Sequence, residues 1–448
     1  MCVPRSLLPL VAVAIVMAAA CGRTGLSSLR GPGDDVSVEP EPSAATGGAG
    51  GTAGASGAGG FAITGDPWPS LGHDPQGTRR SPADTSKNTG KLQWKYSMAG
   101  GVRSSPVVAA DGTVYVVTGY DTLYAIRPPV GGAAGVLKWS YTMPGMQGSP
   151  SNSLSQPLIA PDDTVYFFYE RLHAVGAPVS GAAGLLKWSC DVARFAWVPA
   201  PLGSSPSLGS DGTLYVVSDR LSAIQVPADG TQGVVQWNFE PDSTWTAAPI
   251  IGLDGTVYVD GADTLYAITP PAGGQSGTVK WSYQLRALGP ARALGPDGTV
   301  YAGSNGKVYA IGAPATGATG VLKWSYDTRS RSTSSPAIGP DGTVYVTSTG
   351  GTVHALAALP SGNVVLKWSY KMGADSVLSF SSPALGADGT VYAGADDGNL
   401  YALSAPATGT AGVVRWSYKT GGPVGDPAIG ADGTVYVGSD DGALYALH

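Results

Sequence analysis

Two short patterns that each occur eight times constrain the fold of this chain more than any other feature of its sequence. The first is a β-rich run around a tryptophan, as in Leu-Lys-Trp-Ser-Tyr at residues 322–326, and its eight tryptophans are Trp94, Trp139, Trp188, Trp237, Trp281, Trp324, Trp368 and Trp416. The second is Asp-Gly-Thr followed by alternating apolar residues, and its copies begin at Asp111, Asp211, Asp254, Asp297, Asp341, Asp388 and Asp432, with a degenerate copy at Asp162. The unit recurs every 43 to 51 residues, which predicts a repeat architecture.

Each unit is expected to contain four short strands. In one copy, residues 335–339 are interpreted as a strand that opens at Pro336, because proline lacks an amide donor and suits the first residue of a strand. Asp341-Gly342 predicts a tight hairpin, since glycine adopts a positive φ without steric cost. A β-rich strand follows at residues 343–347, and a glycine turn, a third strand and a looser loop lead to the next tryptophan strand.

The predicted fold is all-β, an eight-bladed β-propeller of four-stranded antiparallel blades. One such sheet cannot bury both of its faces, whereas blades stacked radially bury them and leave only short edges. The repeated tryptophans are then expected to be structural and to dock neighbouring blades, each burying about 150–250 Å². Eight ligand-stacking tryptophans are the alternative, which is disfavoured because a residue at every equivalent position serves the repeat itself. With 66 glycines and only 13% charged residues, the composition suits short strands and tight turns.

The first twenty residues predict an export signal. Arg5 precedes an apolar run at residues 7–20 that fits the core of a signal peptide and is short for a membrane span. The run ends in three alanines before Cys21, which resembles a bacterial lipoprotein cleavage site with Cys21 as the lipidated residue, although such sites usually have leucine at the position of Ala18. An ordinary secretory peptide is the alternative. Gly22 in place of aspartate implies, by resemblance to Gram-negative lipoproteins, an outer-membrane location.

The chain is therefore expected to divide into three parts: a signal peptide at residues 1–20, a lipidation site and disordered Gly/Ala/Ser-rich tether at 21–65, and a propeller at 66–448. The tether has almost no large apolar residues, so it cannot bury enough surface to fold. Within the propeller Cys190 is the single cysteine, which excludes an internal disulfide there, and it is expected to be a packed thiol. The net charge of -6 provides no basic footprint for nucleic acid.

The repeat resembles the quinoprotein, or PQQ-like, propeller family. The blade of that family carries alanine, then aspartate, then Thr-Gly, and then a docking tryptophan. Ala310, Thr316-Gly317 and Trp324 match in that order, as do Ala402, Thr408-Gly409 and Trp416. Gly312 or Ser404 replaces the aspartate, and the loop before the tryptophan is longer. The segment from Trp68 to Pro82 also looks like the lead-in of these propellers, so the resemblance covers residues 66–448.

This resemblance implies how the ring closes. Each tryptophan strand would be the outer strand of its blade, and the strand of Trp94 would complete the last blade, whose other three strands are C-terminal. Such closure removes the free edges of the ring. Relatives of this kind include PQQ-dependent dehydrogenases, in fold only, and the lipid-anchored propeller of the outer-membrane protein assembly machine, which is not an enzyme. Function does not follow from the fold.

No complete active site can be recognised in the sequence, so a binding protein is expected more than an enzyme. PQQ enzymes of the family need Ca²⁺, a carboxylate ligand, a catalytic aspartate and cofactor-clamping residues, and many have adjacent cysteines. Here no cysteines are adjacent, and Glu170 and Glu240, the only glutamates of the propeller, fit no calcium-ligand pattern. Each Asp-Gly-Thr copy offers one carboxylate and is interpreted as a turn. No cofactor or metal is expected, except PQQ with calcium under an oxidoreductase alternative.

The segments that link each tryptophan strand to the next blade depart most from the repeat and form the candidate binding face. In propellers these segments gather around the central channel, and aromatic residues and arginine are enriched at binding hot spots. Arginines on an acidic protein would also attract an anionic ligand, while ordinary solvated loops are the alternative. The candidate residues are Arg103, Arg194, Phe195, Trp197, Trp245, Arg286, Arg292, Arg329, Arg331 and Phe380.

Three functions remain open at this point. The first is a non-catalytic binding or scaffold propeller at the bacterial cell envelope, a monomer attached to the membrane only through its lipid, with an envelope protein or a small, anionic or saccharide ligand on the candidate face. The second is a PQQ-dependent oxidoreductase acting on an alcohol or sugar, which rests on the resemblance alone. The third is a polysaccharide-binding surface protein with Trp197 and Trp245 as sugar platforms. The anchor, the tether and the missing active site favour the first.

Overall fold

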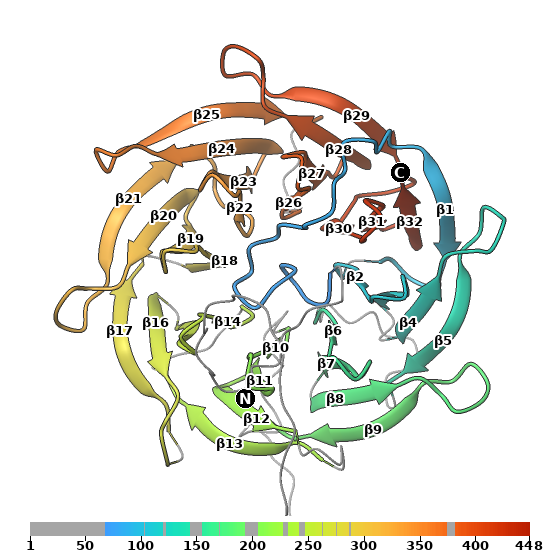
Figure 1. The fold of residues 1–448 in the computed structure, drawn as a ribbon, viewed down its shortest axis with the longest axis horizontal. Helices are drawn as coiled ribbons and strands as arrows, with labels where there is room; N and C mark the ends of the chain where they lie inside the picture. The colour runs from blue at the N-terminus through green and yellow to red at the C-terminus, as the bar shows by residue number, and fades with distance from the viewer. Residues whose placement is uncertain are drawn as a thin grey trace, which may run out of the picture. The chain divides into compact units, whose positions relative to one another are not determined.

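The ring of blades predicted from the repeats is present in the computed structural model. The structure describes residues 68–102, 104–119, 122–143, 155–169, 171–192, 205–226, 232–241, 247–261, 263–274, 276–285, 288–373 and 381–448. Within them, 32 strands form eight four-stranded antiparallel sheets arranged as a propeller (Figure 1), which confirms the predicted fold. The predicted signal peptide, Cys21 and the predicted tether lie outside the described residues. No helix in the described part is long and apolar enough to cross a membrane.

The first two strands of each blade lie nearest the central channel. The first strands, all but one of which have two residues, are β2 (Val107–Val108), β6 (Leu158–Ile159), β10 (Ser207–Leu208), β14 (Ile250–Ile251), β18 (Leu288–Leu294), β22 (Ala337–Ile338), β26 (Ala384–Leu385) and β30 (Ala428–Ile429). The second strands are β3 (Val114–Thr118), β7 (Val165–Tyr169), β11 (Thr213–Val217), β15 (Val257–Asp260), β19 (Val300–Ser304), β23 (Val344–Ser348), β27 (Val391–Gly394) and β31 (Val435–Gly438).

The other two strands form the outer part of each blade. The third strands are β4 (Thr122–Arg127), β8 (Arg171–Gly176), β12 (Leu221–Gln225), β16 (Thr264–Thr269), β20 (Lys307–Gly312), β24 (Thr352–Ala358), β28 (Asn399–Ser404) and β32 (Ala443–Leu447). The outermost strands are β5 (Val136–Thr142), β9 (Leu185–Cys190), β13 (Val234–Phe239), β17 (Thr278–Gln284), β21 (Val321–Asp327), β25 (Val364–Lys371), β29 (Val413–Lys419) and β1 (Leu92–Ser97). We number the blades 1 to 8 in this order.

The ring closes as expected, because β1 pairs with β32 and supplies the outer strand of blade 8. The backbone amides of Lys91 and His448 donate to each other's carbonyl oxygens at 3.0 and 2.9 Å. The buried side chain of Asn88 also donates to the carbonyl oxygens of Gly433 and Leu447, both at 2.9 Å. The closure therefore rests on backbone pairing and on one buried amide that links the start of the ring to its end.

Each docking tryptophan packs against the blade that follows it. The residue four positions before a tryptophan is glycine in every copy except Val364, and a Cβ added at Gly184 would lie 2.7 Å from the Trp139 ring. The backbones join there too, since Ser140 donates to Ala182 at 2.8 Å and Gly184 donates to Ser140 at 2.7 Å. Seven of the eight tryptophans are buried and Trp416 is half-buried, so the absence of a side chain in one blade makes room for the indole of its neighbour.

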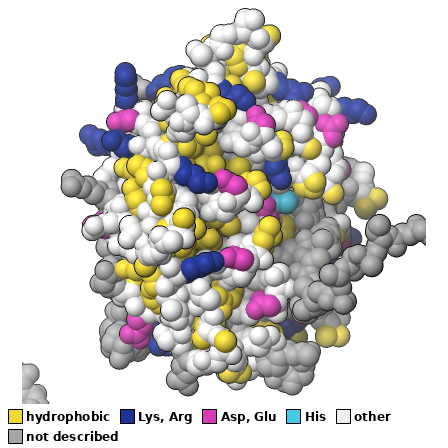
Figure 2. Space-filling model, turned by 60° about the vertical axis from the view of Figure 1, so that its left-hand side comes forward, with side chains coloured by type: hydrophobic (Ala, Val, Ile, Leu, Met, Phe, Trp, Pro, Cys, Tyr) yellow, Lys and Arg dark blue, Asp and Glu magenta, His cyan; other side chains and the backbone are white. Residues whose placement is uncertain are grey.

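The Asp-Gly-Thr copies are hairpin turns. Gly342 has a φ of 76°, and the Oδ1 atom of Asp341 accepts the amide hydrogen of Thr343 at 3.0 Å. In six blades the aspartate also pairs with the cation that precedes the docking tryptophan, and these pairs are Asp111–Lys138, Asp162–Lys187, Asp254–Lys280, Asp297–Lys323, Asp341–Lys367 and Asp388–Arg415. Charges on the outer surface accordingly lie in neighbouring pairs among hydrophobic side chains (Figure 2).

The antiparallel strands define two faces of the ring, because successive connections lie at opposite ends of a blade. We name the end with the Asp-Gly-Thr turns and the loops between third and fourth strands the turn face. The opposite end holds the links between second and third strands and the links between blades. We name it the inter-blade face, and it is the end on which the candidate binding residues are expected.

Candidate functional site

The inter-blade face is described only in part. Arg329 and Arg331 lie there, on the link between β21 and β22, and both side chains are exposed. Arg292 is also described, but elsewhere. The other candidates lie outside the described residues, and these are Arg103, Arg194, Phe195, Trp197, Trp245, Arg286 and Phe380.

The link that carries Arg329 and Arg331 is held by hydrogen bonds at both ends. Thr328 donates its amide hydrogen to the carbonyl oxygen of Gly306 at 2.9 Å, and Ser332 exchanges backbone and side-chain hydrogen bonds with Thr349 at 3.0 to 3.2 Å. Arg329 adopts a left-handed conformation with a φ of 57°, and its amide hydrogen bonds to Asp327 at 2.8 Å. Two exposed guanidinium groups are thus presented on a fixed backbone, an arrangement suited to contact with an acidic surface.

Arg292 does not lie on an exposed link as expected. It is in β18 and its side chain is buried, with its Nη1 atom 2.8 Å from Oδ1 of Asp260 on β15 of blade 4. The reason lies in the repeat, because Arg292 stands where the other seven copies have the proline that opens the first strand. Proline has no amide hydrogen to donate, whereas arginine has one. The first strand of blade 5 accordingly extends over seven residues and pairs with β19.

The Asp260–Arg292 pair is enclosed and incompletely bonded. Both side chains are at most 3% exposed, Nη2 of Arg292 donates to the carbonyl oxygen of Ala248 at 3.3 Å, and neither carboxylate oxygen of Asp260 accepts a well-formed hydrogen bond from a described residue. Burial raises the pKa of Asp260 to about 6, and the attraction of Arg292 offsets only part of that effect. The pair therefore couples blades 4 and 5 at a cost in desolvation.

A segment at residues 68–83, which we name the plug, runs around the inside of the ring (Figure 1). Among the described residues it forms backbone hydrogen bonds with the first strands of six blades. The last residue of each of these strands donates to the plug, and the acceptors are Trp68, Pro69, Pro75, Gln76, Thr78 and Arg79. These amide groups lie on the inner edges of the first strands, where no other described strand pairs with them. The plug accepts their hydrogen bonds and fills the turn-face end of the channel.

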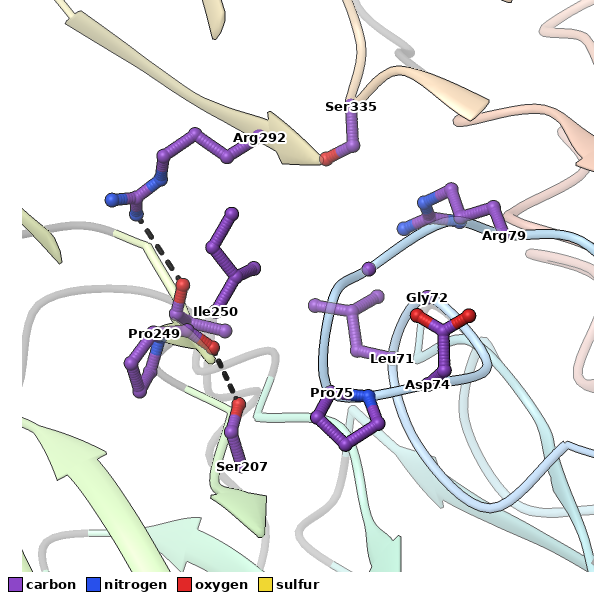
Figure 3. Close-up of a pocket in the computed structure, with 12 residues that line it drawn as sticks. Leu71, Gly72, Asp74, Pro75, Arg79, Ser207, Pro249, Ile250, Arg292 and Ser335 are labelled. Atoms are coloured by element: carbon purple, nitrogen blue, oxygen red, sulfur yellow. Dashed lines mark hydrogen bonds between the residues drawn. The ribbon is translucent and has the colours of Figure 1, made fainter. Parts of the chain in front are cut away.

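A second buried ion pair joins the plug to the last blade. Nη2 of Arg79 lies 2.8 Å from Oδ2 of Asp426, with the two side chains 3% and 14% exposed. Arg79 and Arg292 flank a small space in the channel, beside Pro75 and Ile250 (Figure 3). This channel cavity has a volume of about 30 Å³, which is about the volume of one water molecule.

The channel as described does not fit the quinone cofactor and calcium of the oxidoreductase alternative. Two of its carboxylates, on Asp260 and Asp426, each face an arginine at 2.8 Å, and both oxygens of a third, on Asp74, accept hydrogen bonds from Thr78. No group of three or more His, Cys, Asp or Glu side chains among the described residues could hold a metal ion. A cofactor pocket of roughly 300–1,000 Å³ is likewise far larger than the space between Arg79 and Arg292.

Sequence reasoning missed Arg79, Asp260 and Asp426. One signal was available for Asp260 and Asp426, since each breaks the repeat: Asp260 stands where other copies have Val, Phe, Gly or Thr, and Asp426 stands at a position that is Ser, Gln or Ala elsewhere. Arg79 precedes the repeats, so no periodic comparison reveals it. Its partner lies 347 positions further along the chain, which only the closed ring brings near.

A protein-family model matches the sequence of this chain. The family model described as "Outer membrane protein assembly factor BamB", a PQQ-like repeat family, matches residues 78–194, 178–317 and 264–425. These residues make up well over half of the chain. The chain belongs to this family. Members of the BamB family are thus its sequence relatives, and no curated protein matches it.

Solved structures similar to this BamB-family chain include enzymes and an assembly factor. Quinohemoprotein alcohol dehydrogenase from Comamonas testosteroni is 16% identical, with a TM-score of 0.60 over 86% of this chain and 81% of that one. A europium-containing methanol dehydrogenase is 16% identical, with a TM-score of 0.57 over 84% and 90%. BamB from Moraxella catarrhalis is also 16% identical, with a TM-score of 0.53 over 80% and 98%. At such identities the similarity shows the fold alone.

Proposed function

We propose that this chain is a non-catalytic binding propeller of the bacterial cell envelope that contacts a partner protein through its inter-blade face. The observation that carries the proposal is the fixed, exposed presentation of Arg329 and Arg331 on that face. Arginine forms bidentate hydrogen bonds with carboxylates, so an acidic surface on the partner fits this element.

The channel and the family support the same function. The plug occupies the channel at the turn face, and the carboxylates of Asp260 and Asp426 are paired with arginine. The family to which the chain belongs is described as an outer membrane protein assembly factor, which is a binding role at the envelope. A propeller whose channel is filled by its own chain offers its rim, rather than its centre, to other molecules.

The proposed attachment is a lipid on Cys21 followed by a flexible tether at residues 22–65, with the propeller at the outer membrane. The export-signal pattern and the description of the family support this placement. A single acyl group binds membranes weakly, so an anchor of this type works through several chains on one cysteine. Labelling of the chain with a radioactive fatty acid, and loss of the label in Cys21→Ser, tests the attachment.

Site-specific photocrosslinking in cells tests the contact face. A photoreactive amino acid at position 331 is expected to give defined cross-linked products, whereas the same group at position 179 on the turn face, where Val179 is 99% exposed, is expected to give none of them. Charge reversal at the neighbouring position, Arg329→Glu, is expected to reduce the products from position 331 several-fold. Equal products from both positions, or no effect of Arg329→Glu, would refute the proposal.

A further inference from the structure

A larger cavity opens on the turn face, away from Arg329 and Arg331. It has a volume of about 550 Å³ and lies between the turns of blades 4 and 5 and the plug. Its walls include Leu253 and Asp254 from the first turn, Pro296 and Asp297 from the second, and Arg80 from the plug. A space of roughly 300–1,000 Å³ is typical of pockets for small organic molecules. We name it the turn-face cavity.

Leu253 at the rim of this cavity is unlike its counterparts. In the other seven copies the residue before the turn aspartate is alanine, proline or serine, whereas Leu253 is a large apolar side chain that is 86% exposed. Nothing in the local fold requires leucine there, since the hydrogen bonds of the turn are made by Asp254 and Thr256. Leu253 therefore places an apolar group at the mouth of the cavity, where an apolar part of a ligand can bury it.

Arg80 is the one charged group on the cavity walls that no described residue bonds. Lys280 pairs with Asp254 at 2.8 Å and Lys323 pairs with Asp297 at 2.9 Å. Asp74 also lines the cavity, and both of its carboxylate oxygens accept hydrogen bonds from Thr78. The backbone of Arg80 bridges Leu385, but its guanidinium forms no hydrogen bond or ion pair with any residue that the structure describes. A guanidinium without a bonded partner at the wall of a pocket offers hydrogen-bond donors to an anionic group on a ligand.

We propose that the turn-face cavity binds a small organic anion in which a carboxylate is attached to a short alkyl or aryl group. Arg80 would hold the carboxylate at the plug, and Leu253 with Pro296 would cover the apolar part at the rim. The site is on the opposite face from the partner contact proposed above and shares no residue with it, so either assignment can fail without the other.

Isothermal titration calorimetry of the chain with three probes of one scaffold tests the proposal. The probes are 4-phenylbutyrate, 4-phenylbutanol and 4-phenylbutylammonium, which differ only in the charge of one end. The acid is expected to bind about tenfold more tightly than the alcohol, because a hydrogen bond to a charged group is worth that factor or more, and the amine is expected to bind more weakly still.

Two variants assign the binding to the cavity. Arg80→Gln is expected to weaken binding of the acid about tenfold and to leave the alcohol unchanged, and Leu253→Ser, which installs the residue found at Ser210, is expected to weaken the binding of all three probes. The matched controls are Arg331→Gln on the inter-blade face and Leu359→Ser at an exposed loop of blade 6, and both should titrate like the unaltered chain. Absence of saturable binding, equal affinities for acid and amine, or an Arg80→Gln variant that binds the acid normally would overturn the proposal.

Discussion

The buried pair of Asp260 and Arg292 gives the sharpest test of how the blades are coupled. Replacing Arg292 with methionine keeps most of the side-chain volume but leaves the carboxylate of Asp260 enclosed without the cation that it pairs with among the described residues. Breaking a buried ion pair in this way typically costs about 3–5 kcal/mol. Asp260→Val introduces the apolar residue found at Val117 in blade 1. It leaves the guanidinium of Arg292 buried without a carboxylate and is expected to cost a similar amount.

The double variant Asp260→Val/Arg292→Met is expected to recover the loss. Burial already raises the pKa of Asp260 from 3.8 to about 6 with the arginine in place, and at about 1.4 kcal/mol per pKa unit its ionised form costs about 3 kcal/mol at neutral pH. Removing both charges removes this cost, and well-packed apolar replacements of buried pairs are often neutral or stabilising. We therefore expect the double variant to be at least as stable as the unaltered chain, with a strongly non-additive coupling between the two sites.

The defect of Arg292→Met should also depend on pH. The folded pKa of Asp260 is raised, so between pH 3.8 and about 6 the folded chain holds a proton that the unfolded chain has released, and stability falls as the pH rises through this window. Loss of Arg292 extends the window upward. The difference in unfolding free energy between Arg292→Met and the unaltered chain is therefore expected to be largest above pH 7 and smallest near pH 4.

Urea and thermal unfolding followed by circular dichroism measure these effects. For a chain of 448 residues, a loss of about 3–5 kcal/mol corresponds to a decrease in Tm of roughly 3–6 °C. The reasoning is refuted if the two single variants are each within about 0.5 kcal/mol of the unaltered chain, which is the range of ordinary surface substitutions. It is also refuted if their losses simply add in the double variant.

Three further outcomes are expected. Gly184→Val should lower the Tm by several degrees, because its Cβ would lie 2.7 Å from the ring of Trp139, and thermal unfolding will show the change. Lys367→Met should raise the pKa of Asp341. Partial burial raises this pKa, but hydrogen bonds from Lys367 and the turn threonine outweigh that effect and lower it to about 2. NMR titration of the carboxyl carbon will measure the change. The stability from this lowered pKa is present above pH 3.8 and is lost as the pH falls toward 2, so the difference between variant and unaltered chain should vanish in strong acid. Asn88→Ala should cost about 1–3 kcal/mol in urea unfolding, because it removes a buried side-chain donor that two carbonyl oxygens share.

Each of these expectations has an internal control. Val364 occupies in blade 6 the position of Gly184, so Val364→Ala should be far milder than Gly184→Val, and equal losses would contradict the docking role of the glycine. In Lys367→Met the pKa of Asp254, also about 2, should not move. For the ring closure, Thr89→Ala removes an exposed hydroxyl beside Asn88, and a loss as large as that of Asn88→Ala would show that burial of the amide is not the cause.

The repeated patterns were sufficient to predict the ring. Eight tryptophan strands, seven Asp-Gly turns and one degenerate copy specify eight blades, because each pattern encodes a contact within one blade or with the next one along the chain. Trp139 with Gly184 and Asp341 with Thr343 are examples, and their partners recur at a fixed separation. The resemblance to known propellers added the closure by β1, which the pairing of β1 with β32 confirms.

Only the tertiary structure decided where the unique residues lie. Arg292 looked like an exposed loop residue, but in β18 it is buried beside Asp260 of another blade. Arg79 meets Asp426, and Arg80 reaches the turn-face cavity, because the closed ring brings the plug beside blades that lie hundreds of residues further along the chain. These residues do not recur from repeat to repeat, so the repeat pattern does not predict their positions. A buried charge is tolerated only where the fold places a partner beside it. Local sequence therefore determined the blades, and closure of the ring determined the chemistry of the channel and the cavity.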